Sequence, residues 1–191
     1  MRYRFLSFFV IIIFANLIFT NGISFDPFHL KDKSRSSVER AGDFLQVGLP
    51  LLALGITKFS EDTDGKAQFW KSFLVSNSTT YLLKILVEKE RPNGSCCESF
   101  PSGHTTAAFS GAMFIQQRYG SKYGIPSLLL ASFVGYSRVY AKKHYWIDVI
   151  CGAAIGIFSN VFFVEKSDVG LDGLTLQRYE NGFQLNIRYS L

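Results

Sequence analysis

The 191-residue sequence contains few cysteines and few charged side chains. Three cysteines are too few for a disulfide scaffold, and sixteen glycines without a three-residue period exclude a collagen-like chain. Charged residues make up only 18% of the sequence and apolar residues 48%, so the chain is not intrinsically disordered. A chain of this length and apolar content can form one domain with a sizeable buried core.

The charge that is present is mainly positive, with a net charge of +5 at pH 7. A basic excess is typical of proteins that bind nucleic acid, anionic lipid or a phosphorylated substrate. The sequence has no basic stripe interleaved with aromatic residues, and no internal repeat or low-complexity segment. We therefore expect no nucleic-acid partner, which leaves lipid and phosphorylated substrate.

The first 22 residues have the pattern of an export signal. A basic start, Met1–Arg4, precedes an uncharged apolar run, Phe5–Phe19, and Thr20 and Gly22 are spaced like the small residues of a signal-peptidase site. At ~1.5 Å per residue the run spans ~22 Å, which is shorter than the ~30 Å core of a bilayer. We interpret residues 1–22 as a cleaved signal peptide or as a signal-anchor helix.

Apolar stretches of helical length fill the middle of the sequence. Five of them run over residues 44–57, 69–87, 103–118, 125–141 and 145–164. Residues 23–43 are polar and mixed in charge, so we interpret them as a linker or surface segment. We predict an all-α bundle of five helices, or six if the leader remains, in a domain that covers residues 23–164.

Two of the expected helices indicate whether the bundle lies in a membrane or in solution. The stretch 69–87 carries polar residues such as Lys71 and Asn77, so one of its faces should pack inside the bundle. The stretch 145–164 contains small residues suited to close packing and is long enough to span a bilayer. We therefore expect a membrane-embedded bundle, with a soluble bundle of buried helices as the alternative.

The C-terminal extension, residues 165–191, has a different periodicity. Apolar and polar residues alternate from Leu174 and again from Phe183, which is the period of a β-strand. Between the two runs, Glu180-Asn181-Gly182 favours a tight turn because Asn-Gly tolerates positive φ angles. We predict a β-hairpin over residues 173–190, without a part in the chemistry.

Residues able to do chemistry gather in three short clusters, each at the end of an expected helix. The clusters are Lys84 with Arg91-Pro92, then Pro101-Ser102-Gly103-His104, then Ser137-Arg138 with His144 and Asp148. Each has an ordinary structural explanation on its own: a helix stop, a helix cap, a solvated basic edge or an i,i+4 pair. Those explanations weaken when all the features occur together, and the combination favours a phosphate-transfer site.

Five of these residues suit the binding of a phosphoryl group. Lys84, Arg91 and Arg138 supply charge-assisted donors, and each arginine can bind two oxygens at once. Ser102 and Gly103 stand at the start of a helix, where backbone N–H groups and the helix dipole attract an anion. We predict that all five bind phosphate.

His104, His144 and Asp148 suit the catalysis of phosphoryl transfer. Asp148 follows His144 by one helical turn, so its carboxylate can accept the imidazole N–H and leave the other nitrogen free to attack phosphorus. His144 would form a phosphohistidine, while His104 would protonate the leaving oxygen and then activate water. No metal-binding set accompanies these residues, so we expect neither a metal nor another cofactor.

The spacing Lys84-x6-Arg91-Pro92, Pro101-Ser102-Gly103-His104 and Ser137-Arg138-x5-His144-x3-Asp148 resembles the signature of the type 2 phosphatidic acid phosphatase family. Its superfamily also includes bacterial class A acid phosphatases and vanadium haloperoxidases. The resemblance covers residues 84–148 and shows no departure at any signature position. It implies an all-helical bundle, metal-independent hydrolysis of phosphomonoesters and the residue roles given above.

We therefore expect a hydrolase of phosphomonoesters or pyrophosphates of membrane lipids, in the cytoplasmic membrane with its site facing the periplasm or exterior. Phosphatidic acid, phosphatidylglycerol phosphate, undecaprenyl pyrophosphate and lipid A are candidate substrates. The alternatives are a soluble periplasmic acid phosphatase of broad specificity, a lipid phosphotransferase, and a membrane protein that only binds anionic lipid. The oligomeric state stays open.

The cysteines leave two alternatives. In an oxidising compartment, Cys96 or Cys97 could form a disulfide with Cys151 and tie the loop between the first two clusters to the last helix. Otherwise the cysteines are unbridged small residues.

Overall fold

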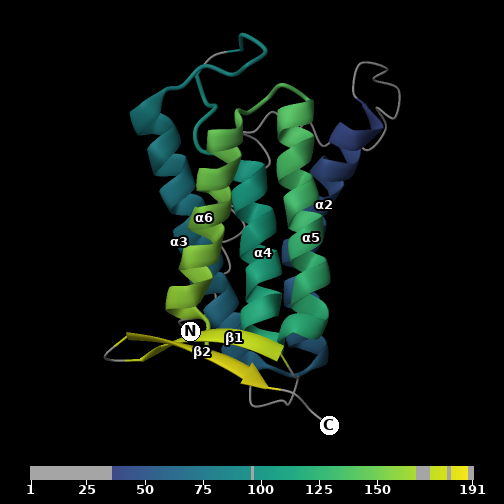
Figure 1. Cartoon of the computed structure of the whole chain (residues 1–191), viewed down its shortest axis with the longest axis vertical. Coiled ribbons are helices and arrows are strands. Elements are labelled where there is room, and N and C mark those ends of the chain that lie inside the picture. Colours follow the sequence, from purple (N-terminus) through teal and green to yellow (C-terminus); the bar gives the residue numbers. More distant parts are fainter. Residues whose placement is uncertain (1–35, 96, 167–172, 180–181, 189–191) are drawn as a thin grey trace, which may run out of the picture. The chain divides into compact units, whose positions relative to one another are not determined.

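Five helices and two strands make up the described part of the computed structural model (Figure 1). The described residues are 36–95, 97–166, 173–179 and 182–188. Their helices are α2 (Ser37–Phe59), α3 (Thr63–Val87), α4 (Gly103–Tyr119), α5 (Ser121–Tyr140) and α6 (Trp146–Phe163). The predicted helical bundle is confirmed for these residues, whereas the predicted leader, residues 1–22, lies outside them.

Helix α2 begins earlier than the sequence indicates. The apolar stretch starts at residue 44, but the helix begins at Ser37 and has Ser36 as its N-cap. The Ser36 side chain accepts a hydrogen bond of 3.2 Å from the backbone of the first turn. Of the two interpretations of residues 23–43, the linker is therefore wrong for residues 37–43, which are helical, whereas several of them, such as Arg40, do lie at the surface. Capping and polar contacts with α5 hold this part of the helix, and apolar periodicity does not reveal them.

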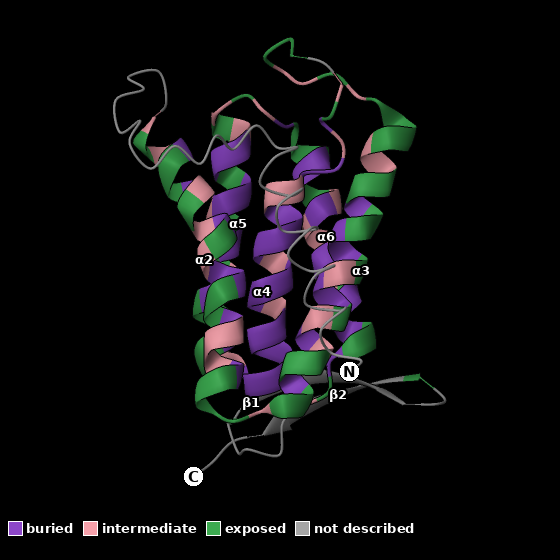
Figure 2. Ribbon diagram, turned by 180° about the vertical axis from the view of Figure 1, so that it is seen from behind, coloured by how far each residue is buried: buried purple, intermediate pink, exposed green. Residues whose placement is uncertain are grey.

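Helix α4 lies at the centre of the bundle and packs against α2, α3, α5 and α6 (Figures 1 and 2). Most of its residues are buried, and several of these, such as Ala108 and Ala112, are small. Helix α6 approaches α4 so closely that a Cβ atom at Gly152 would lie 2.6 Å from the carbonyl oxygen of Ser102. The expected close packing of the last helix is thus confirmed, and the start of α6 lies against the start of α4.

Polar side chains connect α3 to α4 inside the bundle. Ser76 and Ser110 share a hydrogen bond of 2.7 Å between their hydroxyl groups, and Thr80 and Thr106 share one of 3.0 Å. Asn77 is buried beside them and donates to a backbone carbonyl of its own helix. The prediction that a polar face of α3 packs inside the bundle is confirmed.

An ion pair joins the start of α3 to the end of α4. Asp62, the N-cap of α3, accepts hydrogen bonds of 2.7 and 2.6 Å from the guanidinium of Arg118 and one of 2.9 Å from Tyr119. The bond from Arg118 lowers the pKa of the Asp62 carboxyl. Arg118 also donates to the carbonyl of Glu165, just after α6. This end of the bundle is therefore held by a network across three helices.

Two antiparallel strands follow the helices. Strand β1 (Gly173–Tyr179) pairs with β2 (Gly182–Arg188), and Leu174 lies opposite Ile187. Residues 180 and 181, between the strands, lie outside the described residues. Strand β1 contacts α4, α5 and α6 at the end of the bundle away from residues 88–102 (Figure 1).

Many residues on the outside of the bundle are exposed (Figure 2), and large apolar side chains are among them. Examples are Phe44 on α2, Leu86 on α3 and Leu129 on α5, whose exposed fractions are 77%, 69% and 67%. Among the described helices, α6 alone is long and apolar enough to cross a membrane, judged by length and composition.

Candidate active site

The three sequence clusters meet at one end of the bundle. Successive helices run in opposite directions, so α3 and α5 end where α2, α4 and α6 begin (Figure 1). The backbone N–H of Ser102 donates a 2.9 Å hydrogen bond to the carbonyl of Asp148, which joins the second cluster to the third. Lys84, from the first cluster, donates to the carbonyl of Glu98 in the segment that leads to α4 (2.6 Å).

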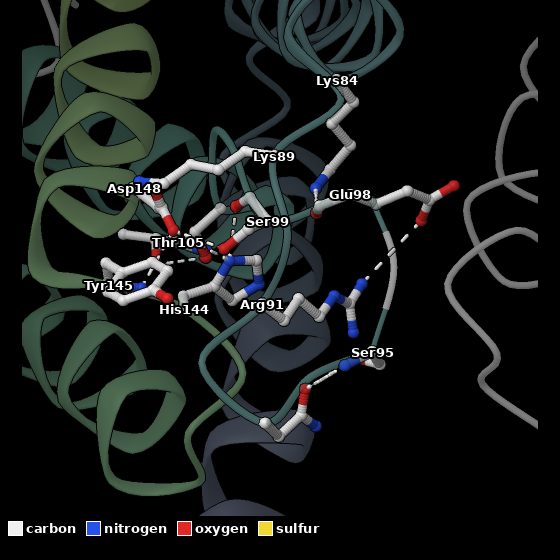
Figure 3. Close-up of polar contacts among 12 residues, drawn as sticks. Lys84, Lys89, Arg91, Ser95, Glu98, Ser99, Thr105, His144, Tyr145 and Asp148 are labelled. Atoms are coloured by element: carbon white, nitrogen blue, oxygen red, sulfur yellow. Dashed lines mark hydrogen bonds and ion pairs between the residues drawn. The ribbon is translucent and has the colours of Figure 1, made fainter.

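His144 is buried, and among the described residues its ring is held by a hydrogen bond to Ser99 (Figure 3). Its Nδ1 lies 2.6 Å from the carbonyl oxygen of Ser99. A carbonyl can only accept, so Nδ1 carries the proton and Nε2 keeps its lone pair in the neutral ring. Burial, together with the nearby charge of Lys84, lowers the pKa of His144 to about 2. The ring is therefore neutral at physiological pH, and its Nε2 has a lone pair available.

Asp148 does not make the expected hydrogen bond with His144. Its Oδ2 lies 4.0 Å from the Nδ1 of His144, beyond hydrogen-bond distance. The carboxylate instead accepts from the Ser99 hydroxyl (2.5 Å) and from the backbone N–H of Tyr145 (2.9 Å). The predicted pairing is wrong because Asp148 lies in the first turn of α6 and turns back to cap that turn, while Ser99 occupies the place beside the imidazole.

Lys89 is a further part of this arrangement that the sequence analysis missed. Its Nζ lies 2.6 Å from Oδ1 of Asp148 and 4.6 Å from the ring centroid of Tyr145 (Figure 3). An ammonium above an aromatic face and beside a buried carboxylate is held by both. Its position between Lys84 and Arg91 in the first cluster is the sequence signal that could have identified Lys89.

Lys84, Arg91 and Gly103 lie where an anion can approach. Arg91 makes one long contact, 3.8 Å, with the Glu98 carboxylate, and its buried Nε forms no hydrogen bond with any described residue. A Cβ atom at Gly103 would lie 3.8 Å from the Lys84 side chain, so the start of α4 faces that lysine. These donors and the helix N-terminus suit a phosphoryl group.

The hydrogen-bonding groups of Ser102 hold neighbouring parts of the site together. Its hydroxyl caps α4, accepting from the backbone N–H of Thr105 at 3.5 Å and from the Thr105 hydroxyl at 2.9 Å. Since its own N–H bonds to Asp148, the structure gives Ser102 a positioning part, and contact with phosphate stays a prediction.

Arg138 is fully buried and connects α5 to α2. Its guanidinium donates to the Asp43 carboxylate (2.6 Å), to the carbonyl of Glu39 (2.8 Å) and to the Ser137 hydroxyl (3.0 Å). The other arginine of the signature, Arg91, has no comparable set of partners among the described residues. The structure thus gives Arg138 a part in holding two helices together, and phosphate binding by it stays a prediction.

His104 lies in the first turn of α4 and meets the same aspartate. Its Nε2 is 3.3 Å from Oδ1 of Asp43, on α2. Asp43 was missed because it belongs to the polar segment that the sequence assigns to a linker. The sequence signal that could have identified it is that the Asp43 carboxylate comes directly before the apolar stretch 44–57.

No three His, Cys, Asp or Glu side chains lie close enough to hold a metal ion within the part of the chain that the structure describes. Cys97 is disulfide-bonded, and Cys151 is a free thiol. Both alternatives from the sequence are therefore wrong: Cys151 forms no disulfide with the loop, and Cys97 is not an unbridged residue.

The helical bundle and the order of its clustered residues define the class of the type 2 phosphatidic acid phosphatases. The PAP2 superfamily model matches residues 65–167, more than half of the chain. The chain belongs to this superfamily.

Similar proteins include two lipid A phosphatases. A lipid A 1-phosphatase from Porphyromonas gingivalis is 36% identical over 104 residues, which cover 49% of this chain and 23% of that protein. A lipid A 4'-phosphatase from Helicobacter pylori is 32% identical over 129 residues, which cover 62% of this chain and 65% of that protein. The chain thus spans less than two thirds of the length of each relative.

A solved structure shares the fold. The crystal structure of LpxE from Aquifex aeolicus has a TM-score of 0.53 at 22% sequence identity, covering 73% of this chain and 93% of that chain.

Proposed function

We propose that the protein is a phosphatase that hydrolyses phosphomonoesters or pyrophosphates of membrane lipids through a phosphohistidine. The observation that carries this proposal is the state of His144: Nδ1 is fixed by the Ser99 carbonyl, and Nε2 is left as a buried neutral nucleophile near Lys84. Similar proteins support the substrate class, since they include the two lipid A phosphatases and an undecaprenyl-diphosphatase from Bacillus subtilis that is 36% identical over 73 residues.

In the first step His144 attacks phosphorus. The Nε2 lone pair forms a P–N bond while the bond between phosphorus and the lipid oxygen breaks, and the leaving oxygen takes a proton from His104. Lys84, Arg91 and the start of α4 stabilise the negative charge on the other phosphoryl oxygens. With a lipid pyrophosphate, the leaving group is the lipid monophosphate.

In the second step water releases the phosphate. The water oxygen forms a bond with phosphorus, its proton passes to His104, and the P–N bond breaks so that Nε2 recovers its lone pair. Both histidines then return to their starting states, and inorganic phosphate leaves. A positioned acid and base of this kind contributes roughly 10² to 10⁴ in rate.

The charge stabilisation in both steps comes from side-chain cations and backbone dipoles, which supports a metal-independent reaction. Activity should survive EDTA. Vanadate, which can take the geometry of the transition state, should inhibit. Loss of activity in EDTA that is restored by a divalent metal would contradict this part of the proposal.

We place the bundle in a membrane because its exterior and interior have the polarity of a membrane protein. Exposed leucine and phenylalanine side chains cover the outer helices, whereas hydroxyl pairs such as Ser76–Ser110 join helices inside. The basic residues before the apolar run of the leader support a site that faces the periplasm or exterior. Hydrolysis of an added, impermeant phosphate ester by intact spheroplasts tests this orientation.

The direct test is phosphate release from phosphatidic acid, phosphatidylglycerol phosphate, undecaprenyl pyrophosphate and lipid A in detergent micelles. We expect turnover of at least one by the full chain and a loss of about a thousandfold or more in His144→Ala. The third histidine supplies a matched control, and His29→Ala should keep its activity. Full activity in His144→Ala would overturn the mechanism.

A further inference from the structure

Asp43 lies between two residues of the sequence signature without belonging to it. Its Oδ1 is 3.3 Å from Nε2 of His104 and 2.6 Å from the guanidinium of Arg138. The three residues come from α2, α4 and α5, which pack against one another (Figure 1). Asp43 also lies outside residues 65–167, which the superfamily model matches. The contact is therefore a feature of this chain that the signature does not contain.

The contact determines which nitrogen of His104 can take part in the reaction. A carboxylate accepts hydrogen bonds, so Nε2 is the nitrogen that carries the proton toward Asp43. The remaining nitrogen, Nδ1, is then the one that can give a proton to a leaving oxygen or take one from water.

We propose that Asp43 is the positioning residue of the general acid–base His104, holding its ring through Nε2 so that proton transfer occurs at Nδ1. The inference rests on the proposed phosphatase function. When His104 receives a proton from water, the carboxylate beside it stabilises the imidazolium, as an aspartate does in other histidine dyads. When His104 gives that proton to the leaving oxygen, the hydrogen bond to Asp43 persists and the ring keeps its orientation.

Arg138 fixes the carboxylate for this task. Because the buried guanidinium also bonds to the Glu39 carbonyl and the Ser137 hydroxyl, it holds Asp43 at a defined place between α2 and α5. Arg138 and His104 therefore meet the same carboxylate oxygen.

Asp43 matters for the protonation of the His104 ring because most of the charges that face this ring are positive. Arg138 from α5 and Lys143 from the loop before α6 are positive and oppose a charged imidazole, and His144 is a further titratable neighbour. Asp43 from α2 is negative and favours it, while Glu39 on the same helix pairs with Lys143 (2.6 Å). Removal of this carboxylate should therefore make His104 lose its proton at lower pH.

Leaving-group dependence separates a positioning role from a merely structural one. A p-nitrophenyl oxygen leaves easily without a proton, whereas the alcohol of dioctanoyl phosphatidic acid needs one. In Asp43→Asn we expect kcat/KM for dioctanoyl phosphatidic acid to fall by about a hundredfold or more, and that for p-nitrophenyl phosphate to change by less than about threefold. The alkaline limb of the pH–rate profile should move to lower pH. Asp43→Glu should restore part of the loss.

Equal losses with both substrates, or an unshifted pH profile, would overturn the inference. The matched control is Asp64→Asn, since Asp64 is an exposed carboxylate in the first turn of α3, and it should leave both substrates unaffected. Failure of the proposed function is recognised separately, because His144→Ala would then retain hydrolysis.

A measurement on the unmutated protein keeps the inference testable if Asp43→Asn does not fold. Nitrogen-15 NMR of histidine-labelled full chain in detergent micelles reports the tautomer of each neutral ring, and His104→Gln assigns the signal. We expect the proton on Nε2 of His104. A proton on Nδ1 in the neutral ring would overturn the inference.

Discussion

At the scale of single residues, the state of His144 is set by its surroundings and not by the carboxylate one turn away. Burial lowers its pKa to about 2, against about 6.5 for an ordinary histidine. A lowered pKa means that below pH ~6.5 the unfolded chain binds a proton that the folded chain refuses. Above pH ~6.5 the titration of His144 therefore leaves the free energy of unfolding unchanged. Below that pH it lowers the free energy of unfolding progressively.

The expected result is a histidine ring that stays neutral from pH 8 to pH 5 in the folded protein. NMR titration of labelled histidine in micelles measures this, and the signal is assigned by its loss in His144→Asn. Titration of that ring near pH 6.5 would contradict the account of its burial.

Replacement of Lys89 should also lower the catalytic rate. In Lys89→Met the buried carboxylate of Asp148 loses its ion pair, so Ser99 and the imidazole it holds are less well fixed. Because small misplacements of a nucleophile are costly, we expect kcat to fall by about ten- to a hundredfold with KM nearly unchanged.

Steady-state kinetics on one lipid substrate checks this expectation, with partial recovery in Lys89→Arg. Lys71→Met, which removes an exposed lysine of α3, is the matched control. A Lys89→Met enzyme with normal kcat would show that the ion pair does not position the nucleophile.

At the scale of elements, the approach of α6 to α4 aligns the site. Gly152 allows this approach, since a Cβ there would lie 2.6 Å from the Ser102 carbonyl and 3.1 Å from the Thr106 hydroxyl. In Gly152→Ala the two helices must move apart near Asp148. We expect a loss of about 1–3 kcal/mol in the free energy of unfolding, together with reduced kcat.

Gly55→Ala is the comparison, because nothing lies within 4 Å of a Cβ at that position of α2. There the change should be neutral or stabilise by about 0.5–1 kcal/mol, since glycine weakens a helix interior. Thermal unfolding of both variants in detergent measures the difference. Equal stabilities would show that the helix contact tolerates a methyl group.

The elements also show how far the sequence predicts the site. Apolar periodicity locates the helices, and the signature locates Lys84, Arg91, His104 and His144 at helix ends. The hydrogen bond from His144 to Ser99 could not be predicted, because every residue type has the same backbone carbonyl. Asp43 and Lys89 meet their partners only after folding brings distant segments together.

At the scale of the whole described bundle, the distribution of polar and apolar side chains fits the proposed phosphatase of membrane lipids. Apolar side chains face outward along α2, α3 and α5, and the catalytic candidates lie together at one end. A lipid whose tails lie beside these helices presents its phosphate at the end where Lys84 and Arg91 are found.

The central claim is that His144 carries the phosphoryl group during turnover. The full chain is mixed with phosphorus-32 p-nitrophenyl phosphate and quenched, and the label on the protein is measured after acid and after base treatment. We predict a base-stable, acid-labile label on His144 that accumulates in His104→Gln, where hydrolysis of the intermediate is slow, and that is absent from His144→Ala. Hydrolysis that continues at the normal rate in His144→Ala, or a label on another residue, would contradict the account.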